Sequence, residues 1–492
     1  MAVTPGSWEL HPDRALPADT GTRAIARRIL DTTAHLPIVS MHGHVEAELL
    51  ADDLPFADPA SLLVTPDHYL VRMLVSQAHT PGAVRDAGVR TVADLGVGGP
   101  GAGAETDPRT IWRRFCAGWP ALRGTPTRLW LEHVLLEVFG ARHRPSPETA
   151  DALYDHLAQR LARPEYRPRA LFERFGIELL ATTDAATSSL AAHARLAADG
   201  WGDRVIPTFR PDALLEPGRA GWTTELAALS DVSGLDAFGY DRFLEAIRQR
   251  RAAFIGAGAR ASDHGHLNVE MTPLPDAEAR RLFDRALREP LDDAAAAAMT
   301  SHLLFQMAAM SADDGLVMQV HTGVLRDHDR GAAARFGPNI GYDIPVRAEY
   351  TRALRPVLEA FGHDPGFRLI VFTVDETVYS RELAPLAGAY PALRLGAPWW
   401  FLDAPEAMRR FREATIETAG LRNTSGFVDD TRAFCSIPAR HDLSRRADAA
   451  YLARLVAEHR LDLDEALDAA HDLAYRLAVD SYPRPPVQDA RA

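Results

Sequence analysis

The sequence contains no lysine, so all 54 of its basic residues are arginines. This absence excludes catalysis through a lysine Schiff base, a lysine-anchored pyridoxal cofactor and the lysine of a phosphate-binding P-loop. Only two cysteines are present, Cys116 and Cys435. Neither a disulfide framework nor a cysteine-based zinc cluster is therefore expected.

Long apolar runs are also missing. No stretch reaches the roughly 20 residues that a membrane-spanning helix needs. The first residues, MAVTPGSWELHPDR, have no apolar segment of the kind found in secretory signals. We therefore expect a cytoplasmic protein with no membrane partner. The 67 acidic residues give a formal net charge of −13, and an acidic surface repels phosphate backbones, so no nucleic-acid partner is expected.

What the 492 residues do contain is typical of a globular α/β protein, with 47% hydrophobic and 25% charged residues. Eight short apolar runs end in polar residues and alternate with helical patterns, which is typical of buried parallel strands. They predict a (β/α)8 TIM-type barrel. An open doubly wound sheet is the alternative, although the first run lacks a glycine-rich phosphate loop. The runs span residues 36–42, 177–183, 204–210, 260–264, 316–322, 367–374, 392–398 and 425–430.

The spacing between the first two runs is far longer than a barrel crossover requires, and its residues show helical periodicity. We therefore predict a distorted barrel with an α-helical insertion after strand one. A long alanine-rich helix is expected over 292–315. The predicted divisions are an N-terminal segment with strand one (1–44), the inserted helical subdomain (45–175), the remainder of the barrel (176–482) and a disordered tail (483–492).

The first run ends in His42-Gly43-His44. Side chains two residues apart on a strand point to the same side, so two imidazoles here can bind one metal ion or one substrate. Asp430 ends the last run, and strands one and eight are neighbours in a closed barrel. Two histidines and an aspartate suit Zn²⁺ or a similar ion. The alternatives are unrelated polar residues at a strand–loop junction and a helix N-cap at Asp430.

Other strand ends carry further candidates. His321 follows the fifth run, and the segment 263–266 (Asp-His-Gly-His) follows the fourth. Either could add a ligand or a proton carrier, although a single histidine at a strand end is more often structural. Trp399 and Trp400 follow the seventh run, where they could form the wall of a sugar pocket or pack inside the barrel.

Two arginines lie where a carboxylate substrate could be held. Arg210 ends the third run, and Arg432 lies two residues beyond Asp430. The planar guanidinium matches a carboxylate, although a surface salt bridge is the common alternative. His68 and Tyr69 lie near the start of the inserted region, and both residue types can take part in proton transfer.

Taken together, these motifs resemble the uronate (glucuronate) isomerase family of the amidohydrolase superfamily. The resemblance extends over roughly residues 30–450 and implies a distorted barrel with a helical insertion. The most specific block is the last, an Asp-Thr-Arg sequence with a downstream Arg-His-Asp. The matching motifs are MHGH, DHYLVR, LLATTDAATSSL, FRPD, ASDH, QVHTGVLRDHDR, FGPNIGYD, PWWFLD and DDTRAFCSIPARHDLSRR.

The resemblance also implies roles for individual residues. It implies a divalent metal ion that is weakly bound or dispensable, with zinc as the leading candidate. It also implies a small sugar acid as substrate. A homo-oligomer is compatible with a barrel of this size. The implied metal ligands are His42, His44 and Asp430. The implied proton-transfer residues are Asp430, Tyr69 and His42. The implied substrate contacts are His68, Arg210, Arg432, Trp399, Trp400 and His321.

Three positions depart from the family pattern. Ser40 stands where an aspartate usually precedes the first histidine. Residues 374–377 (Val-Asp-Glu-Thr) replace an Asn-Pro-Arg-Asp block, and Leu402 replaces an asparagine. Part of the pocket wall is therefore expected to differ from that of the family.

The reaction expected is the interconversion of a hexuronate, D-glucuronate or D-galacturonate, and its keto acid through a cis-enediol. The alternative is a mononuclear metal-dependent hydrolase or decarboxylase of the same superfamily acting on a different carboxylated substrate. Acidic Asp375 and Glu376 favour this alternative, whereas the absence of lysine disfavours a binuclear hydrolase. A binding protein without catalysis is the third hypothesis.

Overall fold

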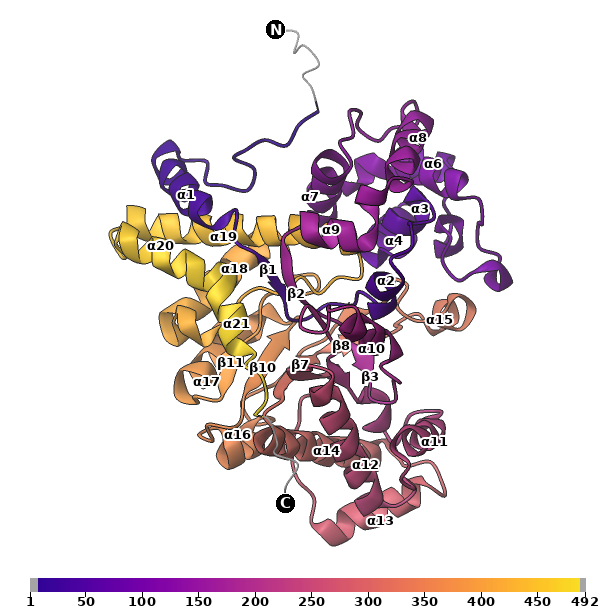
Figure 1. Cartoon of the computed structure of the whole chain (residues 1–492), viewed down its shortest axis with the longest axis vertical. Helices are drawn as coiled ribbons and strands as arrows, with labels where there is room; N and C mark the ends of the chain where they lie inside the picture. Colours follow the sequence, from indigo (N-terminus) through magenta and orange to yellow (C-terminus); the bar gives the residue numbers. More distant parts are fainter. Residues whose placement is uncertain (1–7, 487–492) are drawn as a thin grey trace.

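The computed structural model describes residues 8–486 and has parallel strands at its centre, surrounded by helices (Figure 1). The strands are short, and most of their residues are buried, as the apolar runs predict. They are β1 (Ile38–Ser40), β2 (Ile177–Ala181), β3 (Asp184–Ala185), β4 (Val205–Ile206), β5 (Phe209–Arg210), β6 (Ala261–His264), β7 (Val317–Thr322), β8 (Val324–Leu325), β9 (Ile344–Pro345), β10 (Leu369–Thr373) and β11 (Leu393–Leu395).

Neighbouring strands pair in parallel in two sheets, ordered β1-β2-β4 and β11-β10-β7-β6-β5-β3, while β8 and β9 form an antiparallel pair. Strands β2 and β3 are pieces of one extended run, and so are β4 and β5. Backbone hydrogen bonds from Leu180 through Ala186 to residues 204–210 join these two runs continuously. The two sheets therefore form one continuous series of parallel strands.

The eighth predicted strand, 425–430, forms no regular ladder in the described structure. This segment nevertheless connects the two ends of the series of strands, β11 and β1. The Ser425 N–H donates to the Leu395 carbonyl at 2.9 Å, the Asp430 N–H to the His42 carbonyl at 3.2 Å, and the His44 N–H to the Thr431 carbonyl at 3.0 Å. The arrangement is a distorted (β/α)8 barrel, as the sequence predicts, and its irregular last strand lies beside β1.

Residues 47–174 are helical and contain no strand within the described chain. Aspartate side chains begin several of these helices: Asp58, Asp67 and Asp107 accept hydrogen bonds from backbone N–H groups of the first turns. The boundaries predicted for an inserted subdomain, 45–175, remain a prediction. The α-helices are α2 (Ala47–Asp52), α3 (Pro59–Leu63), α4 (His68–Val75), α5 (Ala83–Asp86), α6 (Pro108–Gly118), α7 (Pro126–His133), α8 (Ala150–Leu161) and α9 (Pro168–Arg174).

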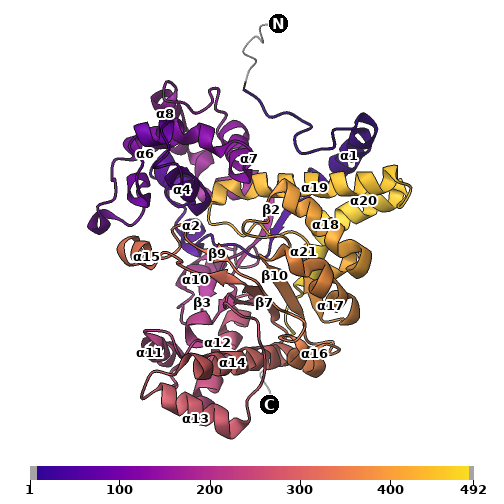
Figure 2. The same cartoon turned by 180° about the vertical axis from the view of Figure 1, so that it is seen from behind.

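The remaining α-helices pack around the strands, with α14 and α16 outside β7 and β10 (Figure 2). Helix α14 confirms the helix predicted over 292–315. They are α1 (Thr20–Thr33), α10 (Ala191–Ala198), α11 (Trp222–Ser233), α12 (Tyr240–Gly256), α13 (Asp276–Ala286), α14 (Asp293–Asp314), α15 (Arg330–Phe336), α16 (Arg355–Phe361), α17 (Ala384–Ala389), α18 (Pro405–Ala419), α19 (Ile437–Ala457), α20 (Leu463–His471) and α21 (Leu477–Ser481).

Helix α19 is the longest of the C-terminal helices and packs along α1 (Figure 1). None of the helices in residues 8–486 combines the length and apolar character required to cross a membrane. The tail predicted over 483–492 has no regular structure up to residue 486, and its last residues, 487–492, lie outside the described residues.

Candidate active site

His42, His44 and Asp430 meet at the carboxyl end of β1. The Nε2 atoms of His42 and His44 lie 3.2 and 3.0 Å from the same oxygen, Oδ1 of Asp430. Asp430 has a backbone φ of +42°, in the left-handed region that aspartate tolerates better than most residues. The first histidine pair and the last aspartate predicted from the sequence are therefore adjacent.

The charges of this group depend on one another. Burial raises the pKa of Asp430, but hydrogen bonds from His42 and His44 outweigh burial and hold that pKa well below its usual range. Burial lowers the pKa of His42, but Asp263 and Asp430 outweigh it and raise the pKa overall. For His44 burial prevails and the pKa is lowered. Asp430 is thus ionised throughout the physiological pH range.

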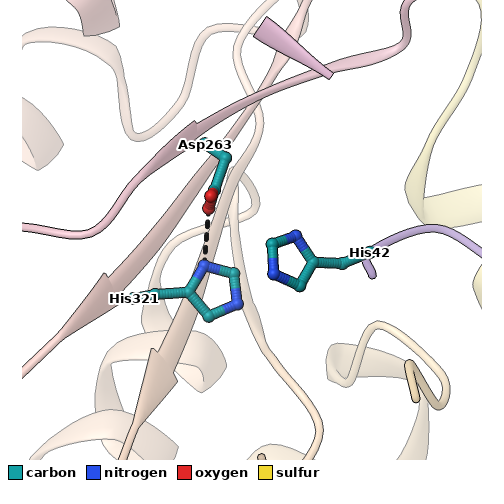
Figure 3. A group of neighbouring side chains, drawn as sticks. All are labelled: His42, Asp263 and His321. Atoms are coloured by element: carbon teal, nitrogen blue, oxygen red, sulfur yellow. Dashed lines mark hydrogen bonds and ion pairs between the residues drawn. The ribbon is translucent and has the colours of Figure 1, made fainter. Parts of the chain in front are cut away.

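His42 also belongs to a second buried group, with Asp263 and His321 (Figure 3). Nδ1 of His321, on β7, is 2.6 Å from Oδ1 of Asp263, on β6. The rings of His321 and His42 stack with centroids 4.2 Å apart. Nη1 of Arg210 is 3.2 Å from Oδ2 of Asp263, and its Nε donates to Asp212 at 2.8 Å. Asp263 therefore connects Arg210 to His321.

Tyr69 has both hydrogen-bonding functions of its hydroxyl engaged. Its Oη donates to Oδ1 of Asp403 at 3.0 Å and accepts the backbone N–H of Phe401 at 2.8 Å. Arg440, on α19, donates to the other oxygen of Asp403 at 2.6 Å and lies over the ring of Trp130. Burial, and next the charge of Asp403, raise the pKa of Tyr69 well above its ordinary value.

A cavity opens at this end of the barrel. Arg432 projects into it and has no carboxylate partner among the described residues. His68 is neutral, because burial and then the charges of Arg432 and Arg440 lower its pKa to about 3. The lining consists of His44, Pro66, Asp67, His68, Tyr69, Arg326, Trp399, Trp400, Asp430, Thr431, Arg432, Ala433 and Arg440.

The cavity brings together most of the residues predicted from the sequence. The exceptions are His42 and His321, which belong to the buried group of Figure 3, and Arg210, which contacts that group through Asp263. His42 and His321 are 1% and 2% exposed. Arg210 is therefore engaged by two carboxylates of the protein, whereas Arg432 is free to bind one from a substrate.

The acidic residues that favoured a hydrolase have structural partners elsewhere. Asp375 caps a short helical turn by accepting the Thr377 N–H, and its other oxygen accepts the Ala348 N–H. Glu376 pairs with Arg410. Leu402 packs in the main hydrophobic core. None of these three lines the cavity described above.

Sequence reasoning assigned no role to Asp403 and Arg440, the partners of Tyr69. Their only signal was membership of the motifs PWWFLD and ARHDLSRR. Helix α4 places His68 and Tyr69 because the Asp67 side chain accepts the Leu70 N–H and so begins the helix at His68. The structure thus gives Asp67, Asp403 and Arg440 positions around the predicted His-Tyr pair.

A barrel with a His-His-Asp group at the carboxyl ends of its strands defines the class: an enzyme with a site able to hold a metal ion.

The family model for glucuronate isomerase matches residues 21–482. Curated relatives named uronate isomerase include one from Rhizobium meliloti, 51% identical over 96% of this chain and 99% of that protein. Another, from Xanthomonas campestris pv. campestris, is 52% identical over 96% and 98%.

Solved structures agree with these matches. The glucuronate isomerase of Caulobacter crescentus is 46% identical, covers 97% of each chain and superposes with a TM-score of 0.92. The uronate isomerase of Thermotoga maritima is 25% identical with a TM-score of 0.88, over 96% of this chain and all of that one. The chain therefore belongs to the uronate isomerase family, and it is an isomerase.

Proposed function

We propose that this chain interconverts a hexuronate, D-glucuronate or D-galacturonate, and the corresponding keto acid by moving a proton between C2 and C1. The reaction is an aldose–ketose isomerisation of a uronate through a cis-enediol. The observation that carries the proposal is Asp430, an ionised carboxylate facing a cavity that also holds an unpaired arginine, Arg432. The first can accept a proton, and the second can bind the uronate carboxylate.

Asp430 is favoured over Tyr69 as the proton carrier. A base must be ionised and within reach of the substrate, and Asp430 meets both requirements. Tyr69 is neutral, donates its proton to Asp403 and accepts a backbone N–H. Its role in this proposal is to form and orient part of the cavity wall. Asp430 takes the C2 proton while the C1 carbonyl oxygen gains a proton, which gives the enediol. After its proton has exchanged with solvent, Asp430 delivers a proton to C1 on the same face as the C2 hydroxyl loses its own proton.

The donor set fits a divalent ion. Two imidazole Nε2 atoms converge on one carboxylate oxygen, and the three ligand atoms lie within 4.8 Å of one another. Asp430 Oδ1 is buried, and its close side-chain contacts are with these two imidazoles. His42, His44 and Asp430 would hold the ion, and zinc is proposed because it prefers this mixture of ligands. When bound, such an ion polarises a carbonyl or hydroxyl oxygen of the substrate.

Other residues that line the cavity would orient the sugar. Arg432 binds the distal carboxylate, and neutral His68 hydrogen-bonds a hydroxyl group. Trp399 and Trp400 form an apolar wall against which a sugar face can pack. Arg210, proposed from the sequence as a second substrate contact, is held by Asp212 and Asp263, so we assign it to fixing His321 through Asp263.

The proposal is tested by proton NMR of the purified protein with D-glucuronate and D-galacturonate in D₂O, with and without added Zn²⁺. A ketose carrying deuterium at C1 is expected, and the two rates identify the preferred uronate. The Asp430→Asn variant, shown to be folded by circular dichroism, is the matched control and should give no exchange. Folded wild-type protein that yields neither product nor exchange with either sugar would refute the proposal.

A further inference from the structure

A second cavity, of about 460 Å³, lies at the end of the barrel away from the candidate active site. Residues 34–37, which precede β1, line it together with Phe175 and Gly176, which precede β2. The other wall is one face of α19, formed by Pro438, His441, Asp442 and Arg445. Their positions follow the pattern i, i+3, i+4, i+7, so they share one side of the helix.

The charge of this cavity is positive although the chain carries a net charge of −13. Arg174 and Arg445 line it, and neither forms an ion pair with a carboxylate of the described residues. Asp442 is the one carboxylate among the described lining residues, and Arg14 and Arg446 already bind it at 2.6 and 2.9 Å. Two arginine charges in the wall are therefore not neutralised by the protein.

Arg445 is the more informative of the two arginines because it is only 8% exposed. Its Nη atoms donate to the backbone carbonyls of Ala34, Leu36 and Pro37. Its Nε is buried without any hydrogen-bond partner in the described structure. Carbonyl oxygens solvate a guanidinium but do not cancel its charge, so a buried, uncompensated cation lies in the cavity wall.

Three histidines complete the lining: His35, His133 and His441. Burial, partly offset by Asp442 and reinforced by Arg14 and Arg446, lowers the pKa of His133 to about 4. Burial also lowers the pKa of His441, whose Nε2 is 3.2 Å from Asp429. The neutral imidazoles of His133 and His441 can therefore provide N–H donors without adding a charge.

We propose that this cavity is a binding site for the phosphate group of a small metabolite or for phosphate itself. Arg174 and Arg445 supply the charge, and the imidazoles supply neutral donors. The exposed guanidinium of Arg174 can bind a tetrahedral oxyanion through two parallel N–H bonds, whereas Arg445, whose Nη atoms contact backbone carbonyls, contributes mainly its charge. The cavity is larger than a bare ion, so it has room for the rest of a phosphorylated molecule. The site is independent of the isomerase reaction proposed above.

The first test is calorimetric titration of the full-length protein with inorganic phosphate and with glucose 6-phosphate, at an ionic strength held constant with NaCl. Saturable binding of at least one of them is expected. Arg174→Gln changes an exposed side chain and should weaken that binding by about tenfold or more, because it removes a charge-assisted hydrogen bond. Absence of saturable binding by both probes would overturn the proposal.

The Arg432→Met variant separates this site from the active-site cavity, where an anion could also bind. Phosphate affinity should survive in Arg432→Met and fall in Arg174→Gln, while the KM for uronate should change only in Arg432→Met. Arg163→Gln, another exposed arginine change in the helical region, is the matched control and should leave the phosphate affinity and the KM unaltered.

Arg445→Gln should also lose phosphate binding, but it removes three carbonyl contacts and requires a check of folding. Equal phosphate affinities for wild type and Arg174→Gln would refute the assignment, as would acetate binding as tightly as phosphate.

Discussion

The contact between Tyr69 and Asp403 yields the sharpest prediction. Asp403→Asn removes a buried negative charge that accepts one hydrogen bond from Tyr69, at 3.0 Å, and one from Arg440, at 2.6 Å. The side chains of Asp403 and Arg440 are 6% and 5% exposed. Leaving one partner of a buried ion pair uncompensated costs about 3–5 kcal/mol. We therefore expect the free energy of unfolding to fall by about that amount.

The kinetic consequence should be separate from the loss of stability. Tyr69 lines the substrate cavity, and its hydroxyl would no longer be fixed by a carboxylate. A displacement of this kind typically lowers turnover by about 100-fold. Asp403 is thus a positioning residue, and kcat should fall more than KM rises.

The chain offers a matched control in Asp448. It forms a comparably buried pair with Arg412, with contacts of 2.7 and 3.1 Å and side chains 9% exposed, and neither residue lines the cavity. Asp448→Asn should lose similar stability without losing turnover. Urea unfolding and steady-state kinetics at a temperature where both variants are fully folded measure the two effects. Equal kcat values for the two variants would refute the positioning role of Asp403.

Four further predictions concern the catalytic group, the substrate contact, the metal and pH. Asp430→Asn should lower kcat by about 10³-fold in stopped assays while circular dichroism stays unchanged. Arg432→Met should raise the KM for uronate by at least about tenfold with a smaller effect on kcat; unchanged KM would contradict carboxylate binding there. Elemental analysis after dialysis against zinc should find about one equivalent in wild type and little in His44→Asn, whereas equal contents would remove His44 from the ligand set. His68 and His133 have folded pKa values of about 3 and 4, below the usual 6.5. Their stabilising effect is complete above pH 6.5 and is lost as the pH falls, so urea unfolding should show about 2 kcal/mol less stability at pH 5.5 than at 7.5.

Local sequence patterns predicted most of the barrel because each strand is a short apolar run with polar residues after it. The position of His42 and His44 followed from strand periodicity, and that of Asp430 from the neighbourhood of first and last strands. The run 425–430 shows the limit of this reasoning. It reads as a strand, but its backbone makes only isolated hydrogen bonds to its two neighbours.

The partners of the site residues could not be derived from local patterns. Tyr69 and Asp403 are 334 residues apart, and their contact depends on how α4 is packed against the segment after β11. The sequence also made Arg210 and Arg432 equivalent candidates. Only the fold shows that Arg210 already pairs with Asp212 and Asp263. Arg432, in contrast, has no carboxylate partner within the described chain.

These charges give the cavity a polarity that fixes how a uronate would lie in it. The ionised Asp430, next to His44, lines the cavity together with three arginines, Arg432, Arg440 and Arg326. Arg440 is neutralised by Asp403, and Arg326 lies 3.3 Å from Asp343, which leaves Arg432 as the arginine able to accept a carboxylate. A substrate carboxylate placed at Asp430 would meet like charge, and a carbonyl end placed at Arg432 would leave a guanidinium unpaired. The orientation with the carboxylate at Arg432 brings the aldehyde end towards Asp430, which is the end where the proton must move.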